Sequence, residues 1–142
     1  MNPMLTSTHP AEPRARHVPL TTGLAAAAEA RTQVRGIVRA WQVPVDAYVA
    51  ALLTSELVTN AVRNEANPTV MLDVTCSTGR LRVDVHDTSR VMPAPADAPA
   101  DAETGRGLII VGALADEWGY YATPGGKAVY FTLAFQPGGS AK

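Results

Sequence analysis

The sequence predicts an α+β domain, a two-layer α/β sandwich in which helices cover one face of a mixed, mostly antiparallel sheet. Three observations predict it. Apolar residues recur at helical spacing over residues 22–63, alternate with polar residues over residues 69–86, and resume helical and then alternating spacing after residue 107. Because helices and strands come in groups, a layer of helices packed on an antiparallel sheet is favoured.

The composition is typical of one soluble domain. The chain has 142 residues, of which 46% are hydrophobic and 18% charged, and its net charge of −1 gives no sign of an electrostatic nucleic-acid binder. No apolar run reaches the roughly 18 residues of a membrane span, and the N-terminus lacks the apolar segment of a secretory signal. We therefore expect a cytoplasmic protein with no membrane partner and no direct nucleic-acid partner. The single cysteine, Cys76, excludes a disulfide framework and a multi-cysteine zinc site, and is expected to be a small apolar side chain.

The two ends of the chain are expected to lie outside the domain. Residues 1–16 contain three prolines and few apolar residues, which predicts a disordered tail. Residues 17–20 suit a short edge strand, in which a proline limits pairing. Residues 137–142 are expected to fray, so the predicted domain spans residues 17–136.

Two helices are predicted next. Residues 22–41 are rich in alanine and have apolar residues at helical spacing. Pro44 then interrupts the chain, and Asp46 opens a second helix. That helix is expected to fade at residues 64–67, because Pro68 disfavours helical geometry in the residue before it.

The period then changes from helix to strand. Residues 69–76 and 80–86 alternate between apolar and polar side chains on either side of a Thr78-Gly79 turn, which predicts an antiparallel hairpin that ends at Asp87. Two further strands, joined by a Pro-Gly-Gly turn, are expected at residues 118–121 and 128–135.

A long connection and a glycine motif separate the two pairs of strands. Residues 88–104 contain three prolines and are too long for a simple connection, which favours a lid or binding loop. Gly105-Arg106-Gly107 ends this loop, and a helix is expected to begin at Leu108. Glycines let backbone amides approach an anion, and a helix N-terminus favours phosphate. The alternative is an ordinary loop ending, since neither the Lys-Ser/Thr of a P-loop nor a βαβ unit accompanies the motif.

The second helix has a polar pair within an apolar surface. Glu56 is the only charged residue in the sixteen residues 47–62, and Asn60 follows it by four positions, so both side chains lie on one helix face. Burying a charge is costly unless a partner compensates it. Either neighbouring backbone groups satisfy this pair, or it forms a site in which the carboxylate handles a proton and the amide oxygen holds a metal.

Asp87, at the end of a predicted strand and next to the long loop, also has two interpretations. It can initiate a turn, or it can accept a hydrogen bond from an amine such as the exocyclic amine of adenine. Mg²⁺ typically takes one or two protein oxygens and completes its shell with phosphates and water. Asn60 near a phosphate pocket suits that coordination.

Four motifs of the chain occur in a recognisable order. They are residues 56–63 (ELVTNAVR), 87–89 (DTS), 105–108 (GRGL) and 125–127 (GGK). Together they resemble the motifs of the Bergerat-fold (GHKL) ATP-binding domains, the superfamily of gyrase, Hsp90, histidine kinases and MutL. The resemblance covers about residues 17–135 and is closest to the SpoIIAB/RsbW-like anti-sigma-factor serine kinases, which are ATP-binding regulators of bacteria.

The resemblance implies a role for each motif. Asn60 would ligate the Mg²⁺ that bridges the ATP phosphates, Glu56 would act as general base or orient the attacking hydroxyl, and Asp87 would accept from the adenine amine. Residues 88–104 would form the ATP lid. The implied phosphate contacts are Gly105, Gly107 and the amide of Leu108, together with Arg63 and Arg106.

The function implied is that of an ATP-dependent serine/threonine protein kinase. It would phosphorylate an anti-sigma-factor antagonist, sequester a sigma factor and form a homodimer, as relatives commonly do. Two alternatives stay open: a nucleotide-sensing binding module without kinase activity, and a degenerate domain that binds no nucleotide. A histidine kinase would need a phosphoacceptor histidine on a dimerising helix, and no segment is left to supply one; His86 is expected to be a solvent-facing strand residue.

The chain departs from the family pattern at three places. Relatives often have His-Gly where this chain has Asn64-Glu65, and a glycine where it has Ser89. Many also place a threonine near the start of the last strand, where Lys127 and Ala128 stand here.

Overall fold

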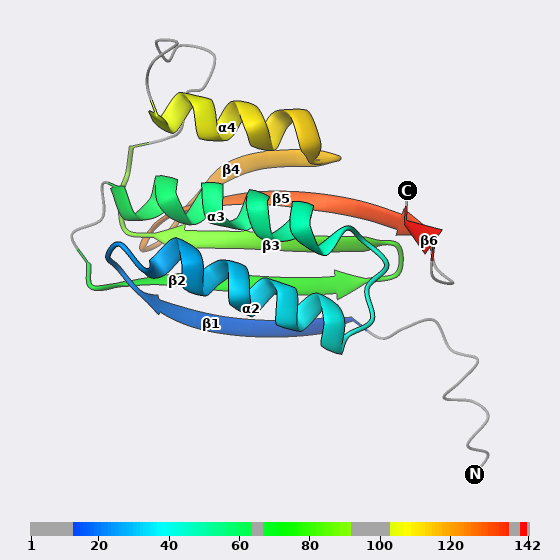
Figure 1. The fold of residues 1–142 in the computed structure, drawn as a ribbon. Coiled ribbons are helices and arrows are strands. Elements are labelled where there is room, and N and C mark those ends of the chain that lie inside the picture. Colours follow the sequence, from blue (N-terminus) through cyan, green and yellow to red (C-terminus); the bar gives the residue numbers. More distant parts are fainter. Residues whose placement is uncertain (1–12, 64–66, 92–102, 137–139, 142) are drawn as a thin grey trace.

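The computed structural model of the chain describes residues 13–63, 67–91, 103–136 and 140–141 (Figure 1). Its elements are β1 (Arg14–Thr21), α2 (Ala26–Ala40), α3 (Ala47–Arg63), β2 (Thr69–Ser77), β3 (Arg80–Asp87), α4 (Glu103–Leu114), β4 (Glu117–Thr123), β5 (Gly126–Gln136) and β6 (Ser140–Ala141).

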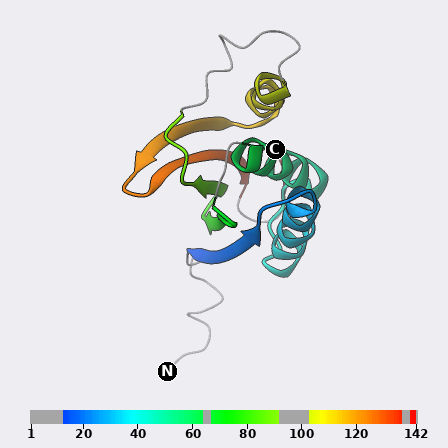
Figure 2. The same cartoon turned by 90° about the vertical axis from the view of Figure 1, so that its left-hand side faces the viewer.

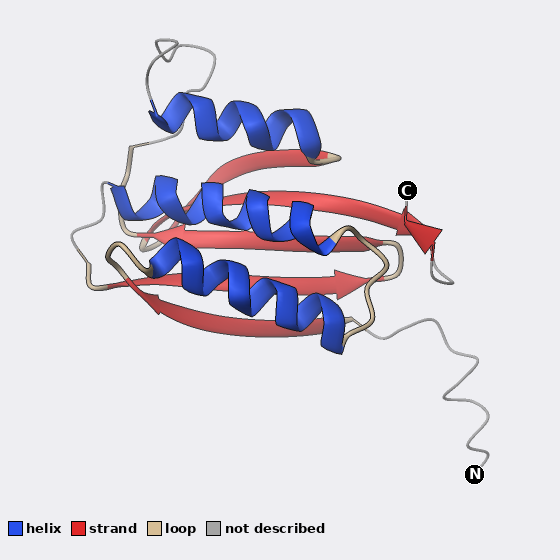
Figure 3. Cartoon of the chain, viewed as in Figure 1, coloured by secondary structure: helices blue, strands red, loops and turns tan. Residues whose placement is uncertain are grey.

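The described strands form one sheet in the order β1-β2-β3-β5-β4, and β6 pairs with β5. All the pairings are antiparallel. The helices lie on one face of this sheet (Figure 3), so the predicted α+β sandwich is confirmed. In the part of the chain that is described, no helix is long and apolar enough to cross a membrane.

The three helices of the described residues form the second layer of the fold. Figure 2 shows α2 and α3 side by side over the sheet, with α4 next to β4 at the other end of the layer. Apolar side chains from both layers meet between them and exclude water, which is the main source of stability in such a fold. The largest completely buried side chains are Phe131, Leu20, Leu53, Leu57, Leu72, Leu81 and Leu108.

Both chain ends are more ordered in places than the sequence indicates. Strand β1 begins at Arg14, inside the segment predicted to be a tail, because Arg14 already pairs with Cys76 of β2. Near the C-terminus, Ser140 pairs with Gln136, where fraying was expected. Arg14 pairs with a strand that is distant in the sequence, whereas Ser140 pairs with the end of the strand just before it; local composition reveals neither pairing.

Local signals explain the boundaries of α3 and of the β2–β3 hairpin. Asp46 precedes α3, and its Oδ1 accepts hydrogen bonds from the backbone N–H groups of Tyr48 (2.9 Å) and Val49 (3.2 Å). These amides have no acceptor within the helix, so the carboxylate caps the helix that Asp46 was expected to open. The hairpin turns at Thr78-Gly79, where the φ of Gly79 is +83°, a value that favours glycine.

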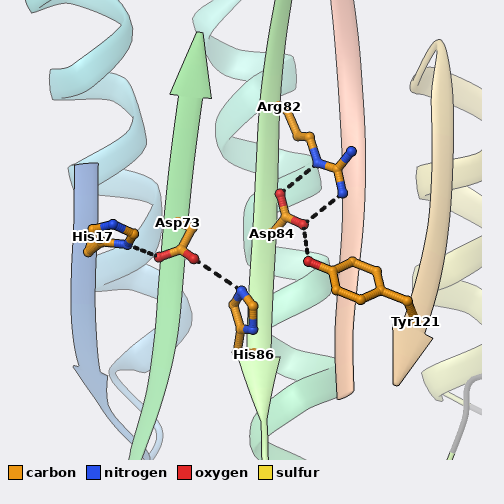
Figure 4. Close-up of polar contacts among 6 residues, drawn as sticks. All are labelled: His17, Asp73, Arg82, Asp84, His86 and Tyr121. Carbon is orange, nitrogen blue, oxygen red and sulfur yellow. Dashed lines mark hydrogen bonds and ion pairs between the residues drawn. The ribbon is translucent and has the colours of Figure 1, made fainter. Parts of the chain in front are cut away.

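The opposite face of the sheet has polar clusters (Figure 4). In the first, Asp73 lies between two histidines, 2.5 Å from Nδ1 of His17 and 3.1 Å from Nε2 of His86. His86 is partly exposed on this face, as expected, although it also has this carboxylate neighbour.

The second cluster centres on Asp84. Its carboxylate accepts from Nε of Arg82 (2.8 Å) and from the hydroxyl of Tyr121 (2.8 Å), and the Arg82 guanidinium lies 4.0 Å from the centre of the Tyr130 ring. Two effects raise the pKa of Tyr121 to about 12: burial of its hydroxyl, which is the larger, and the hydrogen bond to Asp84. Elsewhere on the sheet, burial raises the pKa of the half-buried Cys76 thiol, which agrees with its expected apolar role.

The cap on α3 gives the first testable prediction. Replacing Asp46 with alanine removes the acceptor for two helix amides and should lower the free energy of unfolding by about 1 kcal/mol. Replacing Asp46 with asparagine keeps a side-chain oxygen at the same place and serves as the matched control. Urea denaturation of the two variants measures the difference, and equal stability of Asp46→Ala and the unmodified chain would contradict the cap.

Candidate functional site

Four element ends meet at one end of the molecule. Figure 1 shows the C-terminal end of α3, the end of β3, the start of β5 and the N-terminal end of α4 together on the left-hand side. Each of these ends contains one of the motifs singled out in the sequence. The antiparallel pairing of β3 with β5 brings the second and fourth motifs into contact, since Asp87 lies opposite Lys127.

Helix α3 supplies the Glu56/Asn60 pair. Asn60 is buried, with 8% of its surface exposed, and Glu56 is half-buried. Their helix neighbours Leu53 and Leu57 are completely buried in the core. The two polar side chains therefore stand on a helix whose rotation is fixed by apolar packing.

The contact between Glu56 and α4 explains one glycine of the third motif. A Cβ atom added to Gly107 would lie 2.7 Å from Oε1 of Glu56, closer than van der Waals contact allows. Because Oε1 is the end of a flexible side chain, a larger residue at this position would displace the Glu56 carboxylate, and glycine leaves that carboxylate in place beside α4. Gly107 thus has a structural role beside the phosphate contact that the resemblance implies.

Helix α4 begins earlier than the sequence indicates. Its first residue is Glu103 rather than Leu108, so Gly105 and Gly107 lie inside its first two turns. The first four amides of a helix have no partner within it. Those four amides belong to residues 103–106, while Leu108 lies deeper in the helix with a buried side chain. Phosphate binding by this segment stays a prediction.

Two expected parts of the site are only partly described. Residues 92–102 of the expected lid lie outside the described residues, as do Asn64 and Glu65, and the side chain of Arg106 is not described. Arg63, an expected phosphate contact, is the exposed last residue of α3.

The first residues of the expected lid are fixed to their surroundings. The backbone N–H of Ser89 donates to Oδ1 of Asp87 (2.9 Å), so Asp87 does form the turn that one interpretation of the sequence predicted. The guanidinium of Arg90 donates to the carbonyls of Thr123 (3.3 Å) and Pro124 (3.0 Å). This segment is therefore attached to the β4–β5 turn.

Asp87 has a second partner that sequence reasoning missed. The ammonium of Lys127 donates to both carboxylate oxygens of Asp87, at 2.8 and 3.0 Å. The side chains of Asp87 and Lys127 are 0% and 4% exposed. Lys127 stood out in the sequence only as a departure from the family pattern, since its partner lies 40 residues away on a different strand.

A close backbone contact holds this ion pair in place. A Cβ atom added to Gly126 would lie 2.1 Å from the carbonyl oxygen of Asp87 and 2.6 Å from Cα of Thr88. The start of β5 therefore packs directly on the backbone of the β3 end. Only glycine permits this approach, which sets Lys127 against the carboxylate.

The residues present fit a magnesium ion only in company with phosphate. Among the described residues, no group of three or more histidine, cysteine or acidic side chains has the arrangement of a metal site. Asn60 offers one amide oxygen and Glu56 one carboxylate. Since Mg²⁺ usually combines one or two protein oxygens with phosphate and water, this donor set is sufficient only if a nucleotide supplies the remaining oxygens.

Comparison with known families agrees with this geometry. A family model described as a histidine kinase-like ATPase domain matches residues 20–133, well over half of the chain. The matched segment contains all four motifs of the site. Comparison with curated proteins gave no significant match.

The backbone contact at Gly126 leads to the second prediction. Replacing Gly126 with alanine forces β5 away from Asp87 and should lower the free energy of unfolding by about 2–3 kcal/mol. The neighbouring Gly125 has open space around its Cβ position, so replacing Gly125 with alanine should change stability by no more than about 0.5 kcal/mol. Thermal and urea unfolding of the two variants measure the contrast, and equal destabilisation would refute the close contact.

Proposed function

The chain belongs to the family of histidine kinase-like ATPase domains, and on that premise we propose that it is an ATP-dependent serine kinase of the SpoIIAB/RsbW-like anti-sigma type. It binds ATP with Mg²⁺ and phosphorylates a serine of an anti-sigma-factor antagonist. While the antagonist is phosphorylated, the protein sequesters a sigma factor. A homodimer is the expected assembly.

The observation that supports this proposal most strongly is the placement of Glu56. Its carboxylate is half-buried, lies one helical turn from Asn60 and contacts the N-terminal part of α4 at Gly107. A helix N-terminus attracts phosphate, so the γ-phosphate and a general base would lie close together. Phosphoryl transfer depends mainly on positioning and charge neutralisation, which such a small set of groups can provide.

The proposed reaction uses these groups as follows. The hydroxyl of the acceptor serine gives its proton to Glu56 while its oxygen forms a bond to the γ-phosphorus. The bond from that phosphorus to the oxygen of the β-phosphate breaks, and ADP leaves. Asn60 would hold Mg²⁺ by its amide oxygen, and the ion would supply neutralisation of phosphate charge.

A second candidate function follows from the ion pair at Asp87. A degenerate domain would bind no nucleotide and would keep the fold for contacts with protein partners. The engagement of Asp87 by Lys127 favours this candidate, because the carboxylate expected to receive adenine already has a partner.

The kinase proposal predicts distinct effects at the two helix residues. Replacing Glu56 with glutamine should slow phosphate transfer by about 10²–10⁴-fold, since it removes the proton acceptor, while ATP still binds. Replacing Asn60 with alanine should abolish transfer and weaken the dependence of ATP binding on Mg²⁺. Transfer of labelled phosphate to a co-encoded antagonist, together with calorimetric ATP binding, measures both effects.

Glu29, an exposed carboxylate on α2, provides the control for this experiment. Glu29→Gln should transfer phosphate at the unmodified rate. Full activity in Glu56→Gln would exclude Glu56 as the base. ATP binding without any transfer by the unmodified protein would instead support the binding module.

A further inference from the structure

We propose that Lys127 is a built-in gate of the nucleotide site: it holds Asp87, and a nucleotide base reaches that carboxylate only by displacing the ammonium. This inference rests on the proposed ATP-binding function. It adds a regulatory residue that lowers the affinity of the site until a nucleotide or partner moves it.

The first step of the argument is the occupancy of Asp87. Oδ1 accepts from Lys127 and from the backbone N–H of Ser89, and Oδ2 accepts from Lys127. The carboxylate has no exposed surface. An incoming amine therefore finds the acceptor already used and shielded, and must replace one of these donors.

The second step is that Lys127 is the donor able to leave. The Ser89 amide is fixed by the chain, two residues from Asp87. The ammonium stands at the end of a flexible four-carbon stem. Rotation about this stem can carry the ammonium away from Asp87, whereas the Ser89 amide cannot leave without movement of the backbone.

The third step is that removal of Lys127 must be matched by a new donor. A buried carboxylate that loses its cation is strongly destabilised unless another hydrogen-bond donor replaces the cation. The exocyclic amine of adenine is such a donor. The exchange of one donor for the other is therefore the step that sets nucleotide affinity.

The fourth step connects the gate to the expected lid. Asp87 binds both Lys127 and the Ser89 amide, and Arg90 binds the carbonyls of Thr123 and Pro124 in the turn just before Lys127. Movement of Lys127 therefore acts on the Asp87–Ser89 anchor of the segment that begins the lid, because both donors share Oδ1 of Asp87.

The sequence makes the gate easy to observe. Of the twelve lysine and arginine residues, only Lys127 and Lys142 are lysines. A protein labelled with ¹³C at the lysine ε-carbon gives one signal from each, and a Lys142→Arg variant identifies them. On saturation with Mg·ATP, the Lys127 signal should move to the position of a solvent-exposed lysine, while the Lys142 signal stays in place. An unmoved Lys127 signal in an ATP-saturated protein would overturn the gate.

Variants of the pair test the same inference by affinity. Lys127→Met removes the ammonium and keeps the apolar stem, and it should bind Mg·ATP at least tenfold more tightly than the unmodified chain in calorimetric titration. Lys127→Arg keeps the positive charge and should show no gain. Adding Asp87→Asn to Lys127→Met should remove the gain, because the improved affinity depends on the freed carboxylate.

The outcomes separate the gate from the proposed function. A folded Lys127→Met variant that binds ATP no better than the unmodified chain would overturn the gate and leave ATP binding intact. If neither protein binds ATP, the proposed function fails and the gate fails with it. A gain in affinity without phosphate transfer by either protein supports the gate and rejects the kinase. If Lys127→Met does not fold, the lysine signals of the unmodified protein still decide.

Discussion

The burial of one face of α3 is the constraint on which the rest of the structure depends. This helix contacts α2, α4 and strands β2, β3 and β5, and Leu53, Leu57 and Val58 are completely inaccessible to solvent. Burial of each such side chain contributes about 1.5–3 kcal/mol. Because α3 cannot rotate without exposing them, Glu56 and Asn60 are held in fixed directions by the core itself.

The other half of the site depends on a polar interaction. Asp87 ends β3 in a place without solvent, where a carboxylate requires a cation or several donors. The chain supplies the cation from its own β5, and Gly126 makes the necessary approach of the two strands possible. In the proposed gate the site has two states, one closed by Lys127 and one opened by a competing donor. Nucleotide affinity would depend on how often the second state is reached, for a kinase and for a binding module alike.

Much of this fold is predictable from the sequence because its signals are local. The helical spacing of residues 22–63, the Asp46 cap and the hairpin at Thr78-Gly79 each depend on residues close together in the chain. The start of α4 was misplaced because glycines inside the first turns of a helix resemble a loop ending. The early start of β1 was missed because pairing with β2 determines it, and no local pattern marks that pairing.

The candidate site was predictable in part for the same reason. Glu56 and Asn60 are four residues apart on one helix, and spacing alone places them together. Asp87 and Lys127 meet only because β3 and β5 are neighbours in the sheet, so their ion pair required the topology. The contact between Gly107 and Glu56 likewise joins two helices whose packing no local pattern specifies.

The measurement that tests the account most directly is calorimetric titration of the unmodified protein with ATP, in the presence and absence of Mg²⁺, at concentrations that detect millimolar dissociation constants. The account predicts saturable binding that weakens when Mg²⁺ is removed, since in the proposed site phosphate oxygens and the amide oxygen of Asn60 would hold the ion together. If the folded protein gives no heat of binding under either condition, the account is contradicted. The domain would then serve only as a surface for contacts with other proteins.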